Sequence, residues 1–331
     1  MPQLIIREFK KQDTEDIIEC ARLSFADQFE VEGYDPEIWR KIINRRYSIS
    51  GKALFFILRL LNREPIKFFV AETDGKPIGT AMVEKRGRIG YIQTVMVHPD
   101  FRREGTATQL MKTAINYIKS RKLNKALLHV LSENYPAKIL YQKLGFNTFE
   151  TIQYLTARVD SLPNTTNTNT VRVRDFRKSD VDPVYDLIRM AREPERLKVY
   201  DFNKADLKTS TWQRLARIGT SRKIVAEKDN KIVGYATTMY TTTGVAGRVT
   251  NIEVHPEMAS EGIEEQLIQD STDYLKTRGI KTVLVTVPQV RDAFIERLMS
   301  LGFKKSYAME GMVLAARLQE VIRPQTVKLS F

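Results

Sequence analysis

The feature of this sequence that most constrains its fold is an internal repeat. Five short segments that occur before residue 160 recur in the same order after residue 170. The pairs are LIIREFKKQD with VRVRDFRKSD, FFVAETDGKPIG with IVAEKDNKIVG, VMVHP with IEVHP, KLGFNTFE with SLGFKKSY, and QYLTARV with MVLAARL. Self-similarity of this kind indicates a repeated structural unit. The sequence therefore predicts a tandem duplication of a domain of about 150 residues.

The segment between the copies, SLPNTTNTNT at residues 161–170, is rich in Asn and Thr and has no apolar periodicity. Such a composition is typical of a linker. We therefore expect an N-terminal domain over residues 1–160 and a C-terminal domain over residues 171–331.

Within the first copy, the apolar patterns predict the order β-α-β-β-β-α-β-α-β. Strands are expected at residues 4–8, 67–72, 78–84, 90–97, 126–131 and 149–159, and helices at residues 14–25, 107–118 and 136–144. This order predicts an α/β fold in each copy, with a mixed central β-sheet flanked by helices.

Composition narrows the class of protein. The longest apolar run, ALFFILRLL, is about half the roughly 20 residues that span a bilayer. The single Cys20 has no disulfide partner, and His98, His129 and His255 are too widely spaced to suggest a zinc site. We expect a cytoplasmic protein with no metal and no stable membrane insertion. The net charge of +13 is spread over both copies, which indicates either a polyanionic ligand, nucleic acid or a nucleotide cofactor, or simply a basic surface. The chain has no basic arm and no aromatic-rich RNA motif, so a nucleic-acid partner is not expected.

The loop RREGTA at residues 102–107 lies between a predicted strand and a predicted amphipathic helix. The first N–H groups of a helix have no partner within it, and its N-terminus carries a partial positive charge. Gly105 lets the backbone approach a ligand, and Arg102 and Arg103 supply donors suited to phosphate. The loop is therefore a candidate pyrophosphate site.

This loop and a later segment together resemble the GNAT superfamily of acyl-CoA-dependent N-acyltransferases. The family's phosphate loop, Q/R-x-x-G-x-G/A, is matched by Arg102, Gly105 and Ala107. Its later Asn, Ala and LYxKxGF segment is matched by Asn134, Ala137 and residues 140–146. The resemblance covers nearly all of residues 3–159.

The resemblance implies acetyl-CoA as cosubstrate and a specific set of site residues. The backbone of Val95, Met96 and Val97 is expected to hydrogen-bond the pantetheine arm and to polarise the thioester carbonyl. Asn134 is expected near the pantetheine, and Tyr141 is expected to protonate the leaving thiolate; packing against the core is the other interpretation of Tyr141. The N–H groups expected to hold the pyrophosphate belong to Arg103, Glu104, Gly105, Thr106, Ala107 and Thr108.

The general base and the acceptor site stay open. Many members of the family carry a Glu three residues before the last Val of the central strand, where this chain has Thr94. Glu84, Glu30 and Glu32 are alternative bases. Phe29 and Tyr34, together with Glu84, are candidates for the acceptor site. The basic, apolar stretch at residues 45–63 is either core or a surface helix that touches a membrane or partner.

The second copy keeps the glycine of the loop, as Gly262, and departs from the family pattern at the other positions. Aligned on His-Pro, Arg102 and Arg103 become Ala259 and Ser260, and Ala107 becomes Glu264. Aligned on LGF, the tyrosine position holds Leu298 and the Asn position holds Arg291. Carboxylates at a helix start stabilise the helix but repel a pyrophosphate. We therefore expect that this copy keeps the fold and has lost the cofactor site.

Two functions from different classes follow. The first is an acetyl-CoA-dependent N-acetyltransferase that acts on a primary amine: a small molecule, a peptide N-terminus or a lysine. The second is a CoA-sensing or scaffold protein with little turnover, which the degenerate second copy and the missing strand carboxylate suggest. A monomer or a homodimer is expected in either case.

Overall fold

The computed structural model describes residues 4–24, 40, 43–44, 47–48, 51, 66–163, 171–208, 220–240, 246–259 and 261–315. The acceptor-site candidates Phe29 and Tyr34, the alternative bases Glu30 and Glu32, and most of the predicted linker lie outside these residues.

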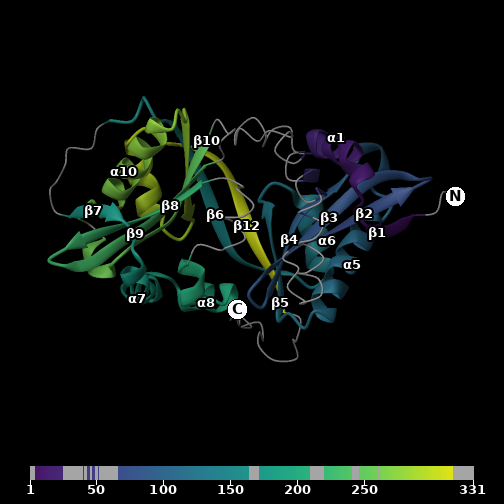
Figure 1. Cartoon of the computed structure of the whole chain (residues 1–331), viewed down its shortest axis with the longest axis horizontal. Coiled ribbons are helices and arrows are strands. Elements are labelled where there is room, and N and C mark those ends of the chain that lie inside the picture. The colour runs from purple at the N-terminus through teal and green to yellow at the C-terminus, as the bar shows by residue number, and fades with distance from the viewer. Residues whose placement is uncertain are drawn as a thin grey trace, which may run out of the picture.

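The described elements confirm the α/β class and the repeat (Figure 1). The first copy contains β1 (Ile5–Glu8), η1 (Lys11–Asp13), α1 (Thr14–Ser24), β2 (Ile66–Thr73), β3 (Lys76–Arg86), β4 (Ile89–Val97), η2 (Pro99–Phe101), α5 (Thr106–Ser120), β5 (Lys125–Leu131), α6 (Tyr135–Lys143) and β6 (Asn147–Arg158). The second contains β7 (Arg172–Asp175), η3 (Lys178–Asp180), α7 (Val181–Ala191), α8 (Pro194–Tyr200), η4 (Lys204–Leu207), β8 (Thr220–Lys228), β9 (Lys231–Tyr240), β10 (Ala246–Val254), η5 (Pro256–Met258), α10 (Ile263–Thr277), β11 (Thr282–Pro288), α11 (Asp292–Ser300) and β12 (Lys304–Ala315).

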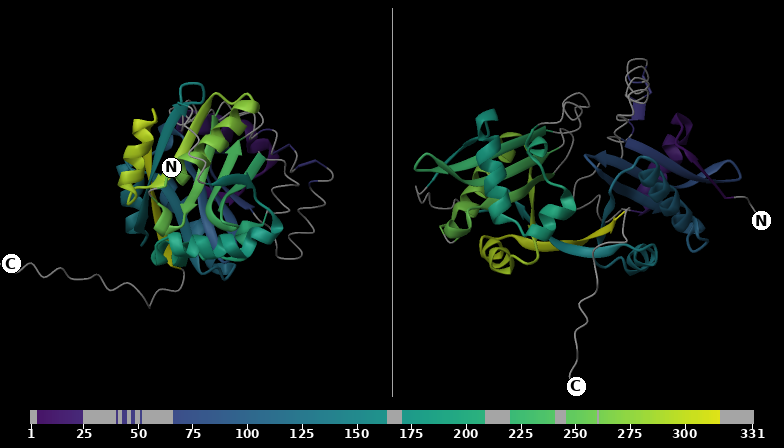
Figure 2. Two further views of the ribbon diagram at one scale, coloured as in Figure 1. Left: turned by 90° about the vertical axis from the view of Figure 1, so that its left-hand side faces the viewer. Right: turned by 90° about the horizontal axis from the view of Figure 1, so that it is seen from below.

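The two copies share one continuous sheet. Its 12 described strands follow the order β1-β2-β3-β4-β5-β12-β6-β11-β10-β9-β8-β7. The last strands of the copies are exchanged: β12 pairs with β5 of the first copy, and β6 pairs with β11 of the second. The exchanged strands also pair with each other, so they cross the middle of the molecule as a two-stranded antiparallel ribbon (Figure 2). The division at residues 161–170 follows the repeat in the sequence, but neither copy completes its sheet from its own strands alone.

Helices cover both faces of each half of the sheet. In the first half, Phe69 and Ala71 pack with α5, and the alternate residue Val70 packs with α1. The second half repeats this arrangement, with α10 on one face and α7 on the other. Because side chains alternate across a strand, each central strand needs apolar residues at nearly every position, as the sequence has.

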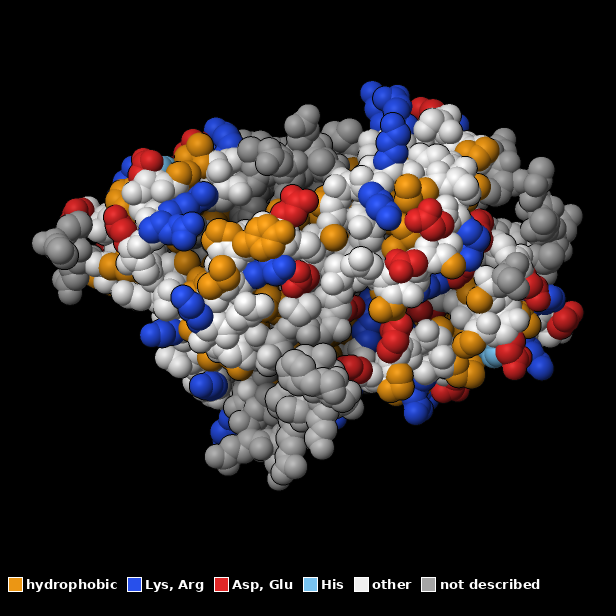
Figure 3. All heavy atoms as spheres, turned by 180° about the vertical axis from the view of Figure 1, so that it is seen from behind, with side chains coloured by type: hydrophobic (Ala, Val, Ile, Leu, Met, Phe, Trp, Pro, Cys, Tyr) orange, Lys and Arg blue, Asp and Glu red, His pale blue; other side chains and the backbone are white. Residues whose placement is uncertain are grey.

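Charged side chains of both signs are interspersed on the surface. Figure 3 shows one face of the molecule, on which Lys and Arg lie among Asp and Glu rather than in one broad basic patch. This distribution agrees with the expectation from the sequence that the positive net charge is spread along the chain.

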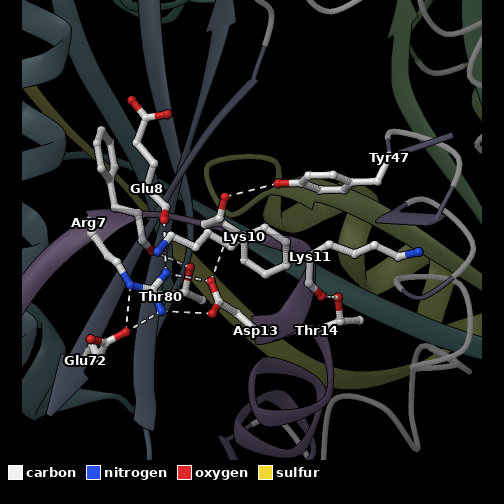
Figure 4. A network of polar contacts seen from close by, with 11 residues as sticks. Arg7, Glu8, Lys10, Lys11, Asp13, Thr14, Tyr47, Glu72 and Thr80 are labelled. Atoms are coloured by element: carbon white, nitrogen blue, oxygen red, sulfur yellow. Dashed lines mark hydrogen bonds and ion pairs between the residues drawn. The ribbon is translucent and has the colours of Figure 1, made fainter. Parts of the chain in front are cut away.

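An ion-pair network joins the first strand to the first helical turn in each half, and Figure 4 shows the network of the first half. The Arg7 guanidinium donates to both oxygens of Asp13, at 2.7 and 2.9 Å, and through Nε to Glu72 at 2.7 Å. Arg174 makes the same contacts with Asp180 and Glu227 in the second half. The RxFxxxD part of the repeated segment is therefore a structural motif that holds strand to helix.

Candidate functional site

The centre of the candidate site is an opening between β4 and β5. These parallel strands pair only from Ile89–Lys125 to Tyr91–Leu127. Beyond that point β4 has a register shift against β3, and Thr94 adopts φ 53°. A bulge of this kind bends a strand and increases its twist. The edge of β4 at Val95, Met96 and Val97 that faces β5 is consequently not paired with it, so it can pair with a ligand, except at the Val97 carbonyl, which accepts a hydrogen bond from Arg102.

The candidate phosphate loop follows directly. Arg103 and Gly105 both have positive φ, 70° and 82°, which turns the chain so that α5 starts at Thr106. The N-cap Gly105 has no side chain to cap the helix, and a Cβ placed there would meet no heavy atom within 4 Å. The N–H groups of Thr106, Ala107 and Thr108 lie in the first turn of α5, where they have no partner within the helix and mark the positive end of its dipole. This geometry suits an anion.

Arg102 ties the loop to the sheet. Its Nε donates to the Val97 carbonyl at 3.0 Å, and its Nη2 donates to Ser24 Oγ at 3.4 Å. The guanidinium thus lies between the end of β4 and the end of α1. It fixes the loop and adds positive charge beside the helix start.

Asn134 and Tyr141 lie at the start of α6 and within it, and this helix follows β5 in the chain. Asn134 is the N-cap of this helix, and its Oδ1 accepts a hydrogen bond from the Ala137 N–H at 3.2 Å. Tyr141 is 6% exposed and packs against Phe146. Burial raises the pKa of Tyr141 to about 12, so its hydroxyl keeps its proton at neutral pH.

Glu84, the acceptor-site candidate within the described residues, lies at the end of β3 beside β4. Its Oε2 accepts hydrogen bonds from Arg86 Nη2 and from Gln93 Nε2, both at 2.7 Å. The carboxylate is therefore held next to the opening, on a side chain that is 28% exposed.

A polar cluster that the sequence did not predict lies nearby. His129 of β5 contacts Tyr91 Oη through Nδ1 at 2.6 Å, and it contacts Glu150 Oε1 of β6 through Nε2 at 3.3 Å. Tyr200 of α8 donates to the same carboxylate, and Arg196 Nε donates to its other oxygen at 2.7 Å. The side chains of His129 and Glu150 are only 12% and 7% exposed. We call these five residues the junction cluster, because both copies of the repeat contribute to it.

The protonation of Glu150 follows from its partners. Burial opposes its ionisation, but the hydrogen bond from His129 and the charge of Arg196 outweigh burial and hold the pKa of Glu150 below its ordinary value. The junction cluster thus contains an ionised carboxylate next to an imidazole.

The second half repeats the backbone turns of the first half but places different side chains beside them. Asn251 and Gly262 repeat the positive φ angles of the first half, at 54° and 75°. Arg291 Nη1, however, donates to the Ile252 carbonyl of β10 at 2.7 Å. Arg291 and Arg297 also donate to both oxygens of Glu264, which is 3% exposed at the start of α10.

These three side chains lie at the positions that correspond to the candidate cofactor-binding groups of the first half. A guanidinium takes the strand carbonyl, and a carboxylate takes the place at the helix start. Burial raises the pKa of Glu264, although the two arginines act in the opposite direction. A cavity of about 280 Å³ remains beside them, lined in part by Glu253, Ala259 and Val290.

The model of the acetyltransferase (GNAT) family matches residues 13–146 and again residues 184–303. The chain belongs to the GNAT family. Both copies of the repeat are thus GNAT regions, and the family places the chain among the acyltransferases.

Similar proteins agree with this assignment. An uncharacterized N-acetyltransferase of Methanocaldococcus jannaschii is 30% identical over 156 residues, which are 45% of this chain and 62% of that protein. A mycothiol acetyltransferase of Streptomyces bingchenggensis is 32% identical over 90 residues, 27% of this chain and 29% of that protein. The GNAT chain therefore spans less than two thirds of the length of either relative.

Solved structures share the tandem fold. A tandem GNAT protein from the clavulanic acid biosynthesis pathway matches 96% of this chain and 100% of its own, with a TM-score of 0.64 and 14% identity. A GCN5-related N-acetyltransferase from Sphaerobacter thermophilus matches 95% and 96%, with a TM-score of 0.61 and 16% identity. These likenesses show the fold.

Two further findings concern the described residues of this GNAT chain. Their helices include none that is both long and apolar enough to cross a membrane. They also contain no group of three or more His, Cys, Asp or Glu side chains placed to hold a metal ion.

Proposed function

We propose that this protein is an acetyl-CoA-dependent N-acetyltransferase whose cosubstrate binds in the N-terminal half alone. The observation that carries the proposal is the contrast between the two openings. In the first half α5 begins without an acidic residue in its first turn, whereas in the second half Glu264 lies at the start of α10, held by Arg291 and Arg297, and Arg291 also donates to the Ile252 carbonyl.

The residues of the first half fit acetyl-CoA in chemistry and order. The N–H groups from Arg103 to Thr108 hold the pyrophosphate, with Arg102 adding charge. The edge of β4 from Val95 to Val97 pairs with the pantetheine arm as a strand pairs with its neighbour. Asn134 lies at the start of α6, where the arm passes.

Acetyl transfer then needs three things from the chain. An N–H of β4 stabilises the negative charge that develops on the thioester oxygen as the amine attacks. The Tyr141 hydroxyl gives a proton to the leaving thiolate. The amine must lose its own proton before attack. The acceptor is a primary amine, carried by a small molecule, a peptide N-terminus or a lysine.

Binding is tested by calorimetry with acetyl-CoA. We expect one site per chain; two sites per chain would contradict the assignment of the second half, and no binding below about 100 μM would refute the proposal.

Turnover is tested by thiol release across a panel of primary amines. Tyr141→Phe should lower kcat roughly 100-fold and leave acetyl-CoA affinity unchanged. A Tyr141→Phe variant as fast as the wild type would remove Tyr141 from the mechanism. Tight binding of acetyl-CoA without thiol release for any amine would instead support a CoA sensor.

A further inference from the structure

The contacts of the junction cluster allow a proton order that runs from Tyr91 through His129 to Glu150. Tyr200 has one hydroxyl proton, which it donates to Glu150. The contact of 3.1 Å between Tyr200 Oη and His129 Nε2 therefore needs the hydrogen on Nε2, which also points to Glu150 Oε1. With Nε2 protonated, Nδ1 of a neutral imidazole carries a lone pair, and it accepts the Tyr91 O–H.

The cluster lies where the opening begins. Tyr91 and Leu127 form the last pair of β4 and β5, and His129 follows two residues later on the same face of β5. The alternate residues Leu128 and Val130 belong to the core under α5. His129 and Tyr91 therefore face the opposite side of the sheet, at the point where β4 and β5 separate.

The cluster exists in one half only. Aligned on the repeat, Tyr91, His129 and Glu150 correspond to Arg248, Thr286 and Tyr307. At that place the second half has a ring stack of Tyr307 on Tyr154 at 4.4 Å, with the Arg248 guanidinium over Tyr154. At these aligned positions, an imidazole next to a carboxylate is thus found only in the half with the candidate phosphate loop.

We propose that the junction cluster removes the proton from the acceptor amine. This inference rests on the proposed N-acetyltransferase function. An N–H bond of the acceptor ammonium breaks and its proton passes to Tyr91 Oη, directly or through one water. The Tyr91 O–H proton moves at the same time to His129 Nδ1, which becomes an imidazolium beside the Glu150 carboxylate. The neutral amine attacks the thioester, and the imidazolium later returns its proton to solvent.

Tyr91 is the catalytic residue in this relay, and His129 and Glu150 are positioning residues that act through it. Burial raises the pKa of Tyr91 to about 12, so its hydroxyl passes protons without resting as a phenolate at neutral pH. The charged and titratable groups that surround His129 come from four elements. They are Glu84 and Arg86 of β3, Tyr91 of β4, Glu150 of β6, and Arg196 and Tyr200 of α8.

The relay gives a role to the second half, which lacks the candidate cofactor-binding residues of the first half. Helix α8 packs on the sheet of the first half through Val199 with Ile89 and Leu127, and through the Tyr200 ring, 5.6 Å from Phe149. It thereby brings Arg196 and Tyr200 to Glu150. The second half completes the proton route of the first.

The test uses the full chain and an amine that the thiol-release assay has shown to be a substrate. Tyr91→Phe cuts the relay and keeps the ring, so the fold should be retained. Near pH 7 the variant should lose about 100-fold in kcat. Its deficit should shrink below about threefold at a pH above the pKa of the amine, roughly 10, because the acceptor then arrives neutral. Acetyl-CoA affinity should not change.

Two further variants separate a proton role from a packing role. Glu150→Gln should lower kcat at neutral pH and regain rate as the pH rises, like Tyr91→Phe. Thr286→Val, at the position of the second half that matches His129, is the control and should behave as the wild type at every pH.

Each contrary outcome refutes a different part of the proposal. A deficit of Tyr91→Phe that stays constant with pH, or no deficit at pH 7, overturns the relay. A wild-type chain that binds acetyl-CoA and acetylates no amine overturns the relay and the enzymatic function, and leaves the cofactor site standing. A wild-type chain that does not bind acetyl-CoA refutes the proposed function itself.

Discussion

The two glycines before α5 and α10 form a matched pair for testing the single cofactor site. Gly105 and Gly262 have φ of 82° and 75°, and a Cβ at either position meets no heavy atom within 4 Å. A side chain therefore costs only backbone strain, about 1–2 kcal/mol for most residues and less for Asn and Asp. We expect Gly105→Asp, Gly105→Asn and Gly262→Asp to have nearly equal melting temperatures.

Acetyl-CoA affinity should separate these variants. A unit charge about 4 Å from a phosphate charge, at an effective dielectric constant near 20, costs about 4 kcal/mol, or roughly 1000-fold in affinity. Gly105→Asp should suffer this loss. Gly105→Asn has the same shape without the charge and should stay within about tenfold of the wild type, and Gly262→Asp should bind normally.

Calorimetry at low ionic strength and again near 0.5 M salt checks the reasoning. Salt screens exposed charges, so the difference in acetyl-CoA affinity between Gly105→Asp and Gly105→Asn should be smaller at the higher salt concentration. Equal losses for Gly105→Asp and Gly105→Asn would show that charge is not the cause. A loss in Gly262→Asp equal to that in Gly105→Asp would show that the second half also binds the cofactor.

Three further predictions concern stability. Gly90→Ala places a Cβ 2.4 Å from Ile118 Cγ1 and should cost about 1–3 kcal/mol in urea unfolding; in an Ile118→Ala background this cost should vanish. Arg7→Ala leaves the buried Asp13 without its ion pair and should cost about 3–5 kcal/mol, a loss that Arg174→Ala should match in the other half; a loss below 1 kcal/mol would show the network to be dispensable. Stability should fall as the pH rises from about 10 through 12, because the folded state holds tyrosine protons that the unfolded chain releases near pH 10; melting curves at pH 9 to 12 measure this. The buried tyrosines whose pKa is raised to about 12 are Tyr91, Tyr141 and Tyr235.

The elements of the fold were predictable because their signals are local. The helix predicted at residues 107–118 is α5 at Thr106–Ser120, and the strand predicted at residues 90–97 is β4 at Ile89–Val97. Strand exchange was not predictable. Apolar alternation identifies a strand and its buried face. Because β6 and β12 are copies of one segment with equivalent patterns, the sequence alone does not show which of them pairs with β5 and which with β11.

The site was predictable where it depends on contiguous residues and not where it depends on distant ones. The phosphate loop and the start of α6 are short motifs. The junction cluster unites β4, β5, β6 and α8, and Tyr200 is 71 residues from His129. The carboxylates of the second loop indicated repulsion of a phosphate, but the sequence did not reveal that Arg291 and Arg297 hold Glu264 there.

The exchanged strands bear on how the chain folds while it is made. Strand β5 obtains its partner β12 only after about 170 further residues have been synthesised. At 5–20 residues per second this delay is roughly 10–35 s. During that time the nascent first copy either exposes the edge of β5, which is a template for aggregation, or pairs β5 with its own β6. In the second case β6 must leave β5 again before β12 can take its place, so the exchange adds a rearrangement to the folding of the chain.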